Sequence, residues 1–194
     1  GLKRLIVQEK VFNEVVERIS ASFATRKIGP AHEETTQLGP LAAKRQLDLL
    51  VEQVSDAVRK GAKIMTGGHS LEKQLGGSFY EPTVLANVNP DMRVWKEEVF
   101  GPVLPVVSFR TEEEAIALAN DTTYGLGGYV YTKDLERADR VADAIQSGMV
   151  SINGTNYTTP FNPFGGYKNS SIGREHGKWG FHEVTQLKVK ARNK

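Results

Sequence analysis

The sequence contains no cysteine. This absence excludes disulfide bonds and cysteine-ligated zinc, and it removes from the chain the commonest covalent nucleophile of carbonyl chemistry. Long apolar runs are also missing, since none approaches the ~20 residues of a membrane span. The first residues show no signal-peptide cleavage pattern. These absences fit a cytoplasmic protein, which is the location we expect.

An excess of charge of one sign is missing as well. The chain has 25 Lys and Arg against 23 Asp and Glu, for a net charge of +2. Positive and negative charges are therefore nearly equal in number, which predicts neither a nucleic-acid partner nor binding to a membrane surface. The four histidines show no metal-ligand spacing, no glycine-rich phosphate loop follows a strand, and Ser170 and Ser171 lack the context of a serine nucleophile. We therefore expect no metal site and no serine hydrolase.

What the sequence does contain is an alternation of strand and helix periodicities over 194 residues, a length that suits one domain. Such alternation implies parallel crossovers and a three-layer α/β sheet. Pro82 predicts that the strand around it lies at a sheet edge, and Pro105 is an anomaly in a strand that otherwise reads as buried. The predicted strands are 3–8, 63–66, 79–88, 103–109, 127–131 and 149–153, and the predicted helices are 11–23, 47–58, 111–119, 134–145 and 174–180.

The most informative local feature is the stretch 97–103, which reads Glu-Glu-Val-Phe-Gly-Pro-Val. Two adjacent carboxylates, Glu97 and Glu98, stand beside the ring of Phe100 at the start of a predicted buried strand. A carboxylate can accept two ribose hydroxyls, as the acidic residue of dinucleotide-binding folds does, and an aromatic ring can pack on a flat ligand. The alternative is an ordinary solvated pair before a turn, and the local spacing alone favours that alternative.

The last third of the chain holds a long loop, 154–166, rich in Thr, Asn, Pro and Phe. Loops of that length in compact domains are functional or disordered, and the aromatic content favours a function here. The paired glycines 165–166 permit close backbone approach or form a simple turn. Arg174 beside Glu175 predicts a loop clamp. The alternating apolar and basic residues 187–191 predict an edge strand or a strand that pairs with a partner chain.

Together these stretches resemble the aldehyde dehydrogenase superfamily in five blocks that keep the family's order. The blocks are KRLIV at 3–7, EEVFGPV at 97–103, YGL and YTKD at 124–134, VSIN at 150–153, and PFGGYKNSSIGRE at 163–175. The resemblance implies the family's three-layer α/β/α catalytic domain over 1–185. It also implies a C-terminal oligomerisation strand or tail over 186–194, and hence a homo-oligomer, a dimer or a tetramer.

The resemblance also implies a reaction. Enzymes of this family oxidise an aldehyde to the carboxylic acid with NAD⁺ or NADP⁺, through a cysteine thiohemiacetal and a thioester that a glutamate-activated water hydrolyses. By the same resemblance Glu98 binds the nicotinamide ribose, Phe100 lies beside the nicotinamide, and Gln46 contacts the other ribose. The loop 154–162 matches the substrate tunnel, and its candidate residues are Thr155, Tyr157 and Phe161, the last two as walls.

The family register places the nucleophilic cysteine two residues before Gly1, and the general-base glutamate, the oxyanion-hole asparagine and the Rossmann unit further upstream. We therefore expect no catalytic residue in this chain, incomplete cofactor binding, and no turnover by the chain alone. Ser171 also departs from the family, which has glycine at that position. The alternative is a stand-alone pseudo-enzyme or subunit-interaction module of the same fold, with 187–191 as its added strand. Either way we expect self-association.

Overall fold

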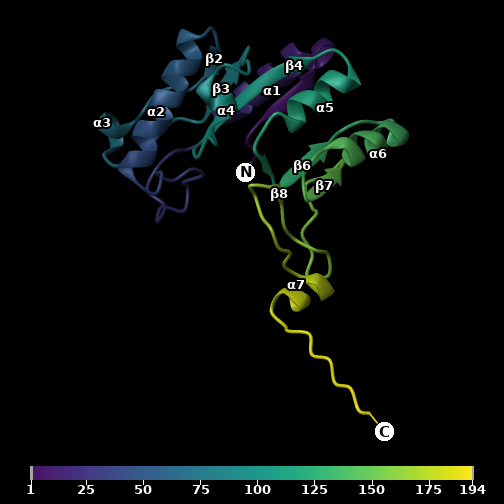
Figure 1. Ribbon diagram of the computed structural model, residues 1–194. Helices are drawn as coiled ribbons and strands as arrows, with labels where there is room; N and C mark the ends of the chain where they lie inside the picture. The colour runs from purple at the N-terminus through teal and green to yellow at the C-terminus, as the bar shows by residue number, and fades with distance from the viewer. Residues whose placement is uncertain (1, 194) are drawn as a thin grey trace. The chain divides into compact units, whose positions relative to one another are not determined.

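The structure is a computed structural model that describes residues 2–193 and divides the chain into two compact units, 1–111 and 112–194 (Figure 1). Compact units are not by themselves domains, so the division into 1–185 and 186–194 stays a prediction. The outer ends of those two ranges, Gly1 and Lys194, lie outside the described residues.

Unit 1 is built on a four-stranded mixed sheet. Its strands are β1 (Leu5–Gln8), β2 (Lys63–Thr66), β3 (Thr83–Ala86) and β4 (Val103–Phe109). The strand order is β1-β4-β3-β2. Strands β1 and β3 both run parallel to β4, whereas β2 runs antiparallel at the edge. The predicted α/β class is confirmed, because parallel neighbours require helical crossovers between them.

The two prolines of this sheet correct one prediction and explain an anomaly. The edge position predicted for 79–88 is wrong, because β3 lies between β4 and β2. Pro82 precedes the strand, and Thr83 N–H donates to the Pro102 carbonyl at 2.8 Å, so the ladder loses no donor. Pro105 is the last residue of β4 paired with β3, and Val106 is the first paired with β1. The missing N–H of Pro105 therefore falls where the strand changes partner.

Helices cover both faces of this sheet, as the predicted layering requires. The helices of unit 1 are α1 (Phe12–Ala24), α2 (Lys44–Arg59), α3 (Glu72–Leu75) and α4 (Arg93–Lys96), with a 3₁₀ turn η1 (Glu9–Val11) before α1. On one face Val16 of α1 packs with Val84 and Val106. Every residue of β3 is buried, so the other face is covered as well, and α2 carries a buried apolar stripe that includes Leu47, Leu50 and Val54. Gly61, with φ of +102°, follows the end of α2, as predicted.

Over its described residues, 112–193, unit 2 has two small sheets and three helices. Its strands are β5 (Tyr124–Gly125), β6 (Gly127–Val130), β7 (Met149–Ile152) and β8 (Tyr167–Lys168), and its helices are α5 (Glu112–Asn120), α6 (Leu135–Ala144) and α7 (Gly177–Glu183). Strands β6 and β7 pair in parallel and β5 and β8 antiparallel. The predicted cap of α6 is confirmed, since the Asp134 carboxylate accepts the Arg137 N–H at 3.0 Å.

The C-terminal part departs from two predictions. Helix α7 begins three residues after the predicted start at Arg174, because Glu175 is bridged in extended form to Phe164 and His176 has φ of +66°. Residues 186–193 form neither helix nor strand, so the strand predicted at 187–191 is not present here. A strand requires a ladder partner, and its pairing with another chain stays a prediction. Within residues 2–193 no helix has the length and apolar character to cross a membrane.

Candidate functional site

Glu98 and Phe100 lie in the loop 97–102, which joins α4 to β4 and which we name the acidic loop. Val99 is buried between them and anchors the loop in unit 1. The ring of Phe100 is 58% exposed and the Glu98 side chain is 41% exposed. The loop therefore presents one carboxylate and one aromatic ring outward, at the entrance to a buried parallel strand.

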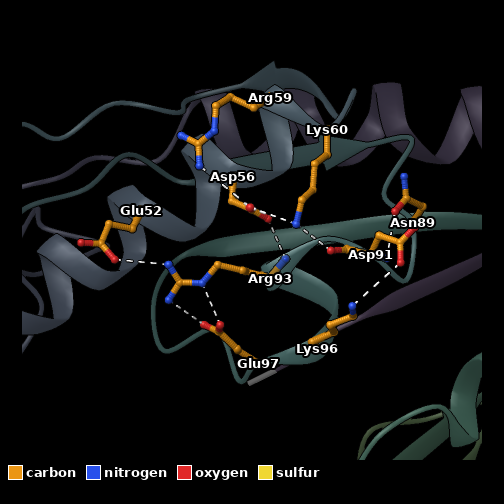
Figure 2. A network of polar contacts seen from close by, with 9 residues as sticks. All are labelled: Glu52, Asp56, Arg59, Lys60, Asn89, Asp91, Arg93, Lys96 and Glu97. Atoms are coloured by element: carbon orange, nitrogen blue, oxygen red, sulfur yellow. Dashed lines mark hydrogen bonds and ion pairs between the residues drawn. The ribbon is translucent and has the colours of Figure 1, made fainter.

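The side chain of the neighbouring Glu97 is equally exposed, at 41%, but protein groups bind both of its oxygens. Figure 2 shows Arg93, one helical turn earlier, holding both Glu97 oxygens, with Nε at 2.7 Å from one and an Nη nitrogen at 3.0 Å from the other. The Gln53 amide of α2 donates to Glu97 at 3.0 Å. These hydrogen bonds, that of Arg93 first, hold the pKa of Glu97 below its usual range. Glu97 therefore anchors the loop to α4 and α2, and we do not assign it a role in ligand binding.

A second carboxylate fixes the start of α4 on α2. Asp56 accepts the backbone N–H of Arg93 at 2.9 Å and forms an ion pair with Lys60 at 3.0 Å (Figure 2). The backbone hydrogen bond from Arg93 is the main reason that the pKa of Asp56 is lowered. The guanidinium of Arg93 also reaches Glu52 of α2 at 3.2 Å. Arg93 therefore joins α2, α4 and the acidic loop through both its backbone and its side chain.

Glu98 has a much weaker partner. The Lys3 ammonium lies 3.5 Å from a Glu98 oxygen, donates to the Val99 carbonyl at 2.9 Å, and sits 4.4 Å from the centroid of the Phe100 ring. Both charged side chains of this pair are 41% exposed, and such pairs exchange readily with water and ligands. An exposed acceptor beside an exposed ring fits the hydroxyls of a ribose and the flat face of a nicotinamide.

Gln46 lies on the first turn of α2, half-buried. It shares a helix face with Leu50 and Gln53, which are four and seven residues further on. These two hold the acidic loop: a Cβ on Gly101 would lie 2.5 Å from a Leu50 methyl, and Gln53 donates to the Glu98 carbonyl at 3.4 Å. The structure thus puts all three predicted cofactor residues in unit 1, on or beside the α2 face that supports the loop.

The three candidate substrate residues lie in unit 2, where the structure separates their roles. Tyr157 stacks on Tyr129 of β6 with ring centroids 5.4 Å apart, and the two hydroxyls are 2.9 Å apart. This hydrogen bond is the main cause that raises the pKa of Tyr129 to about 12. A Cβ on Gly127 would lie 2.4 Å from the Tyr157 hydroxyl, so any larger residue there would displace the Tyr157 ring. Tyr157 anchors its loop, whereas Thr155 is exposed and Phe161 is 80% exposed.

The paired glycines 165–166 serve close backbone approach, as one of the two predictions had it. A Cβ on Gly148 would lie 1.9 Å from the Gly165 carbonyl oxygen, and Gly166 packs against Ser170. Phe164 and Glu175 exchange two backbone hydrogen bonds of 2.8 and 2.7 Å. The segment is therefore held backbone to backbone, where any side chain would intrude.

Arg174 and Ser171 hold this segment locally. Arg174 donates to the Gly173 carbonyl at 2.7 Å and lies over the Tyr167 ring, so its partners are a carbonyl and a ring and not Glu175. The Ser171 hydroxyl donates to the Gly173 carbonyl at 3.0 Å, which explains how serine is accommodated there. A cavity of about 330 Å³ lies beside these residues, between the glycine pair and Glu183. Among residues 2–193 no cluster of histidine, aspartate or glutamate could hold a metal ion.

Sequence reasoning missed three residues that hold the site. Arg93 had a usable signal, because it precedes Glu97 by four positions on a helical turn. Lys168 had none: its ammonium donates to the carbonyls of Asn120 and Thr122 at the end of α5. Lys3 had none either, since its partner Glu98 is 95 positions away.

Comparison with known proteins shows which protein family this chain is similar to. The model of the Aldehyde dehydrogenase family matches residues 1–190. The mitochondrial succinate-semialdehyde dehydrogenase of Oryza sativa subsp. japonica is 44% identical over 187 residues, which are 95% of this chain and 35% of that protein. The succinate-semialdehyde dehydrogenase [NADP(+)] of Deinococcus radiodurans is 44% identical over 96% of this chain and 39% of its own length.

Solved structures agree. The succinate-semialdehyde dehydrogenase of Burkholderia pseudomallei superposes with a TM-score of 0.89 at 41% identity, over 93% of this chain and 37% of that one. The NAD⁺ complex of an aldehyde dehydrogenase from Bacillus cereus gives a TM-score of 0.90 at 35% identity, over 96% and 38%. The chain thus spans between about a third and two fifths of the length of the relatives that it matches.

Proposed function

The chain belongs to the aldehyde dehydrogenase family, and we propose that it supplies the nicotinamide-facing loop and the substrate loop of an enzyme that oxidises an aldehyde to the carboxylic acid with NAD⁺ or NADP⁺. The observation that carries this proposal is the contrast within the acidic loop. Glu97 is bound on both oxygens by Arg93, whereas Glu98 and Phe100 face outward on a loop that this clamp holds still. A loop that is already held in one conformation loses less conformational entropy when a ligand binds.

Three residues would hold the cofactor. The Glu98 carboxylate would accept ribose hydroxyls, the exposed Phe100 ring would pack beside the nicotinamide, and Gln46 would contact the other ribose. When bound, the dinucleotide supplies the hydride acceptor of the reaction. The residues of this chain bind and orient that acceptor, and the loop 154–162 would line the path of the aldehyde, with Thr155 and Phe161 exposed on it and Tyr157 as its anchor.

We propose that the 194 residues alone do not turn over, because no side chain among them replaces a cysteine thiolate. The purified chain, incubated with aldehyde and NAD⁺ or NADP⁺, should form no reduced cofactor by absorbance. Turnover above a buffer control would contradict this. A protein in which this chain follows a segment that carries the family's cysteine nucleophile, general-base glutamate and Rossmann unit should be active, and this positive control separates a missing nucleophile from a wrong assignment.

For the substrate we propose a small aldehyde with a polar or charged head. The segment 154–159 offers the hydroxyl and amide groups of Thr155, Asn156, Thr158 and Thr159 and no charged side chain. Relatives named for succinate semialdehyde, betaine aldehyde and aminoaldehydes support this class. Names that place relatives in mitochondria, chloroplasts and peroxisomes leave the cytoplasmic location a prediction.

The nicotinamide-facing role can be tested without turnover. Saturation-transfer NMR should detect millimolar binding of nicotinamide mononucleotide to the 194-residue chain, and Glu98→Gln and Phe100→Leu should each weaken it about fivefold or more. Glu17→Gln on α1 and Phe181→Leu on α7 are matched controls, because both residues are exposed and should leave binding unchanged. Absence of binding by the wild-type chain, or equal effects of site and control variants, would overturn the assignment.

A second candidate is a subunit-interaction module, favoured by the apolar surface at the C-terminus. Trp179, Phe181, Val184, Leu187 and Val189 are all exposed, Leu187 to 96%. Large apolar side chains exposed in one short segment are typical of protein interfaces. Light scattering at high concentration should show a dimer or larger species, and Leu187→Glu should shift it towards monomer. A monodisperse wild-type monomer would contradict both this module and the proposed homo-oligomer.

A further inference from the structure

Lys3 reaches the acidic loop because of the sheet register. Strands β1 and β4 are parallel, with Leu5 opposite Val106, so Lys3 lies beside the first residues of β4, close to the end of the acidic loop. The neighbouring Arg4 lies over the Trp95 ring, 4.6 Å from its centroid, and holds the backbone of this segment against α4. The Lys3 ammonium therefore has a defined place over the Phe100 ring and is not a free surface charge.

Lys3 is the positive charge that balances Glu98 beside Phe100 among the described residues. Glu97 is neutralised by Arg93, so it adds little net charge on the ligand side of the loop. Glu98 contributes one negative charge and Lys3 one positive charge, 3.5 Å away. An ammonium near the face of an aromatic ring is attracted by the ring's quadrupole, and it repels any second cation that packs on the same ring. Removal of Lys3 would leave the carboxylate uncompensated.

We propose that Lys3 determines which charge state of the nicotinamide ring this loop prefers: it disfavours the oxidised, cationic ring relative to the reduced, neutral one. This inference rests on the proposed function of Glu98 and Phe100. Ribose contacts are common to both forms and cancel in the comparison, because specificity is a difference of affinities. What remains is the interaction of the ring's charge with Lys3 and Glu98. Lys3 thereby raises the affinity for the reduced form relative to that for the oxidised form above the ratio that Glu98 and Phe100 alone would give.

The test is the ratio of dissociation constants for oxidised and reduced nicotinamide mononucleotide, measured by NMR titration of the 194-residue chain. Lys3→Met removes the charge at nearly constant length, and we expect it to shift the ratio about threefold in favour of the oxidised form at low salt. Lys3→Arg keeps the charge and should keep the ratio. Lys178→Met is the matched control, because Lys178 also lies over a ring, that of Trp179, outside the acidic loop.

Ionic strength gives an independent readout that a structural role would not move. Added salt should return the Lys3→Met ratio towards the wild-type value, because it screens the Glu98 carboxylate that this variant leaves uncompensated, and it should change the wild-type ratio less. An unchanged ratio in Lys3→Met, with both forms still bound, overturns the inference about Lys3 and leaves the proposed function standing. Absence of binding of either form by the wild-type chain overturns the proposed function, and this inference falls with it.

Discussion

The two loops that carry the candidate site residues are held by opposite kinds of interaction. The acidic loop 97–102 of unit 1 is fastened by charged groups, chiefly the bond of Arg93 to Glu97 and the weaker pair of Lys3 with Glu98. The loop 153–166 of unit 2 has no charged residue at all. Neutral contacts hold it: the Tyr129–Tyr157 hydroxyl pair, the Asn153 amide bonded to both polar backbone groups of Thr132, and backbone bridges.

This difference has a physical consequence. Charged clamps weaken with salt and with protonation, whereas hydroxyl pairs and backbone contacts respond to neither near neutral pH. A loop proposed to meet a charged cofactor carries its own charges, and a loop proposed to meet the aldehyde does not. Four predictions can break or sharpen the comparison.

The largest effect should come from a substitution that disturbs the packing of the uncharged loop 153–166 of unit 2. Gly148→Ala puts a Cβ 1.9 Å from the Gly165 carbonyl oxygen, and two backbone segments must then separate. We expect a loss of about 3 kcal/mol in the free energy of unfolding, measured by denaturant titration. Gly154→Ala is the matched control, since its nearest neighbour would be 3.6 Å away, in ordinary contact. Equal stabilities of the two variants would show that the glycine pair is not closely packed.

The second-largest effect should come from removing the Arg93 guanidinium, which clamps the acidic loop. Arg93→Met removes the fork that holds Glu97 and the bond to Glu52, so the acidic loop should open more often. We expect amide hydrogen exchange at 98–101 to become about tenfold faster, with a smaller increase for Arg93→Lys, which keeps the charge but not the fork. Arg18→Met removes an exposed pair with Glu14 on α1 and should change nothing. Unchanged exchange in Arg93→Met would refute the clamp.

Tyr129→Phe should have an intermediate effect. The variant leaves the Tyr157 hydroxyl without its partner, which costs about 1 kcal/mol of stability and loosens the loop 153–166. Tyr131→Phe is the comparison, because Tyr131 also reaches this loop, at the Gly154 carbonyl, but is exposed and should be near neutral. The loss in Tyr129→Phe should be the same at low and high salt, and a strong salt dependence would contradict a neutral anchor.

The smallest effect should be the loss of folding stability that acid causes by protonating Glu97 in unit 1. The pKa of Glu97 is lower in the folded chain than in the unfolded chain, so the unfolded state binds more protons and stability falls as pH falls. The contribution is complete above the unfolded value of about 4.3 and is lost below it, and partial exposure limits it to less than about 1 kcal/mol. Glu97→Gln should flatten this part of the stability profile, measured by thermal unfolding between pH 3 and pH 6, roughly the span of that titration.

Elements with local signals could be predicted from the sequence. The cap of α6 at Asp134 and the glycine after α2 depend on residues a few positions apart, and both are confirmed. The edge position inferred from Pro82 failed, because strand order depends on pairing across the sheet. The start of α7 failed for a similar reason, since the bridge between Phe164 and Glu175 holds the residues before it extended.

The sequence by itself determined the family and the α/β class and predicted the stretch that we propose faces the cofactor, because these follow from short blocks in a fixed order. Composition and spacing left Glu97 and Glu98 as two equivalent neighbours, and only the family resemblance singled out Glu98. Only the tertiary structure decided that Arg93 binds the first while the second faces outward beside Lys3. The physical reason is the parallel pairing of β1 with β4, which brings together groups that lie 95 positions apart along the chain.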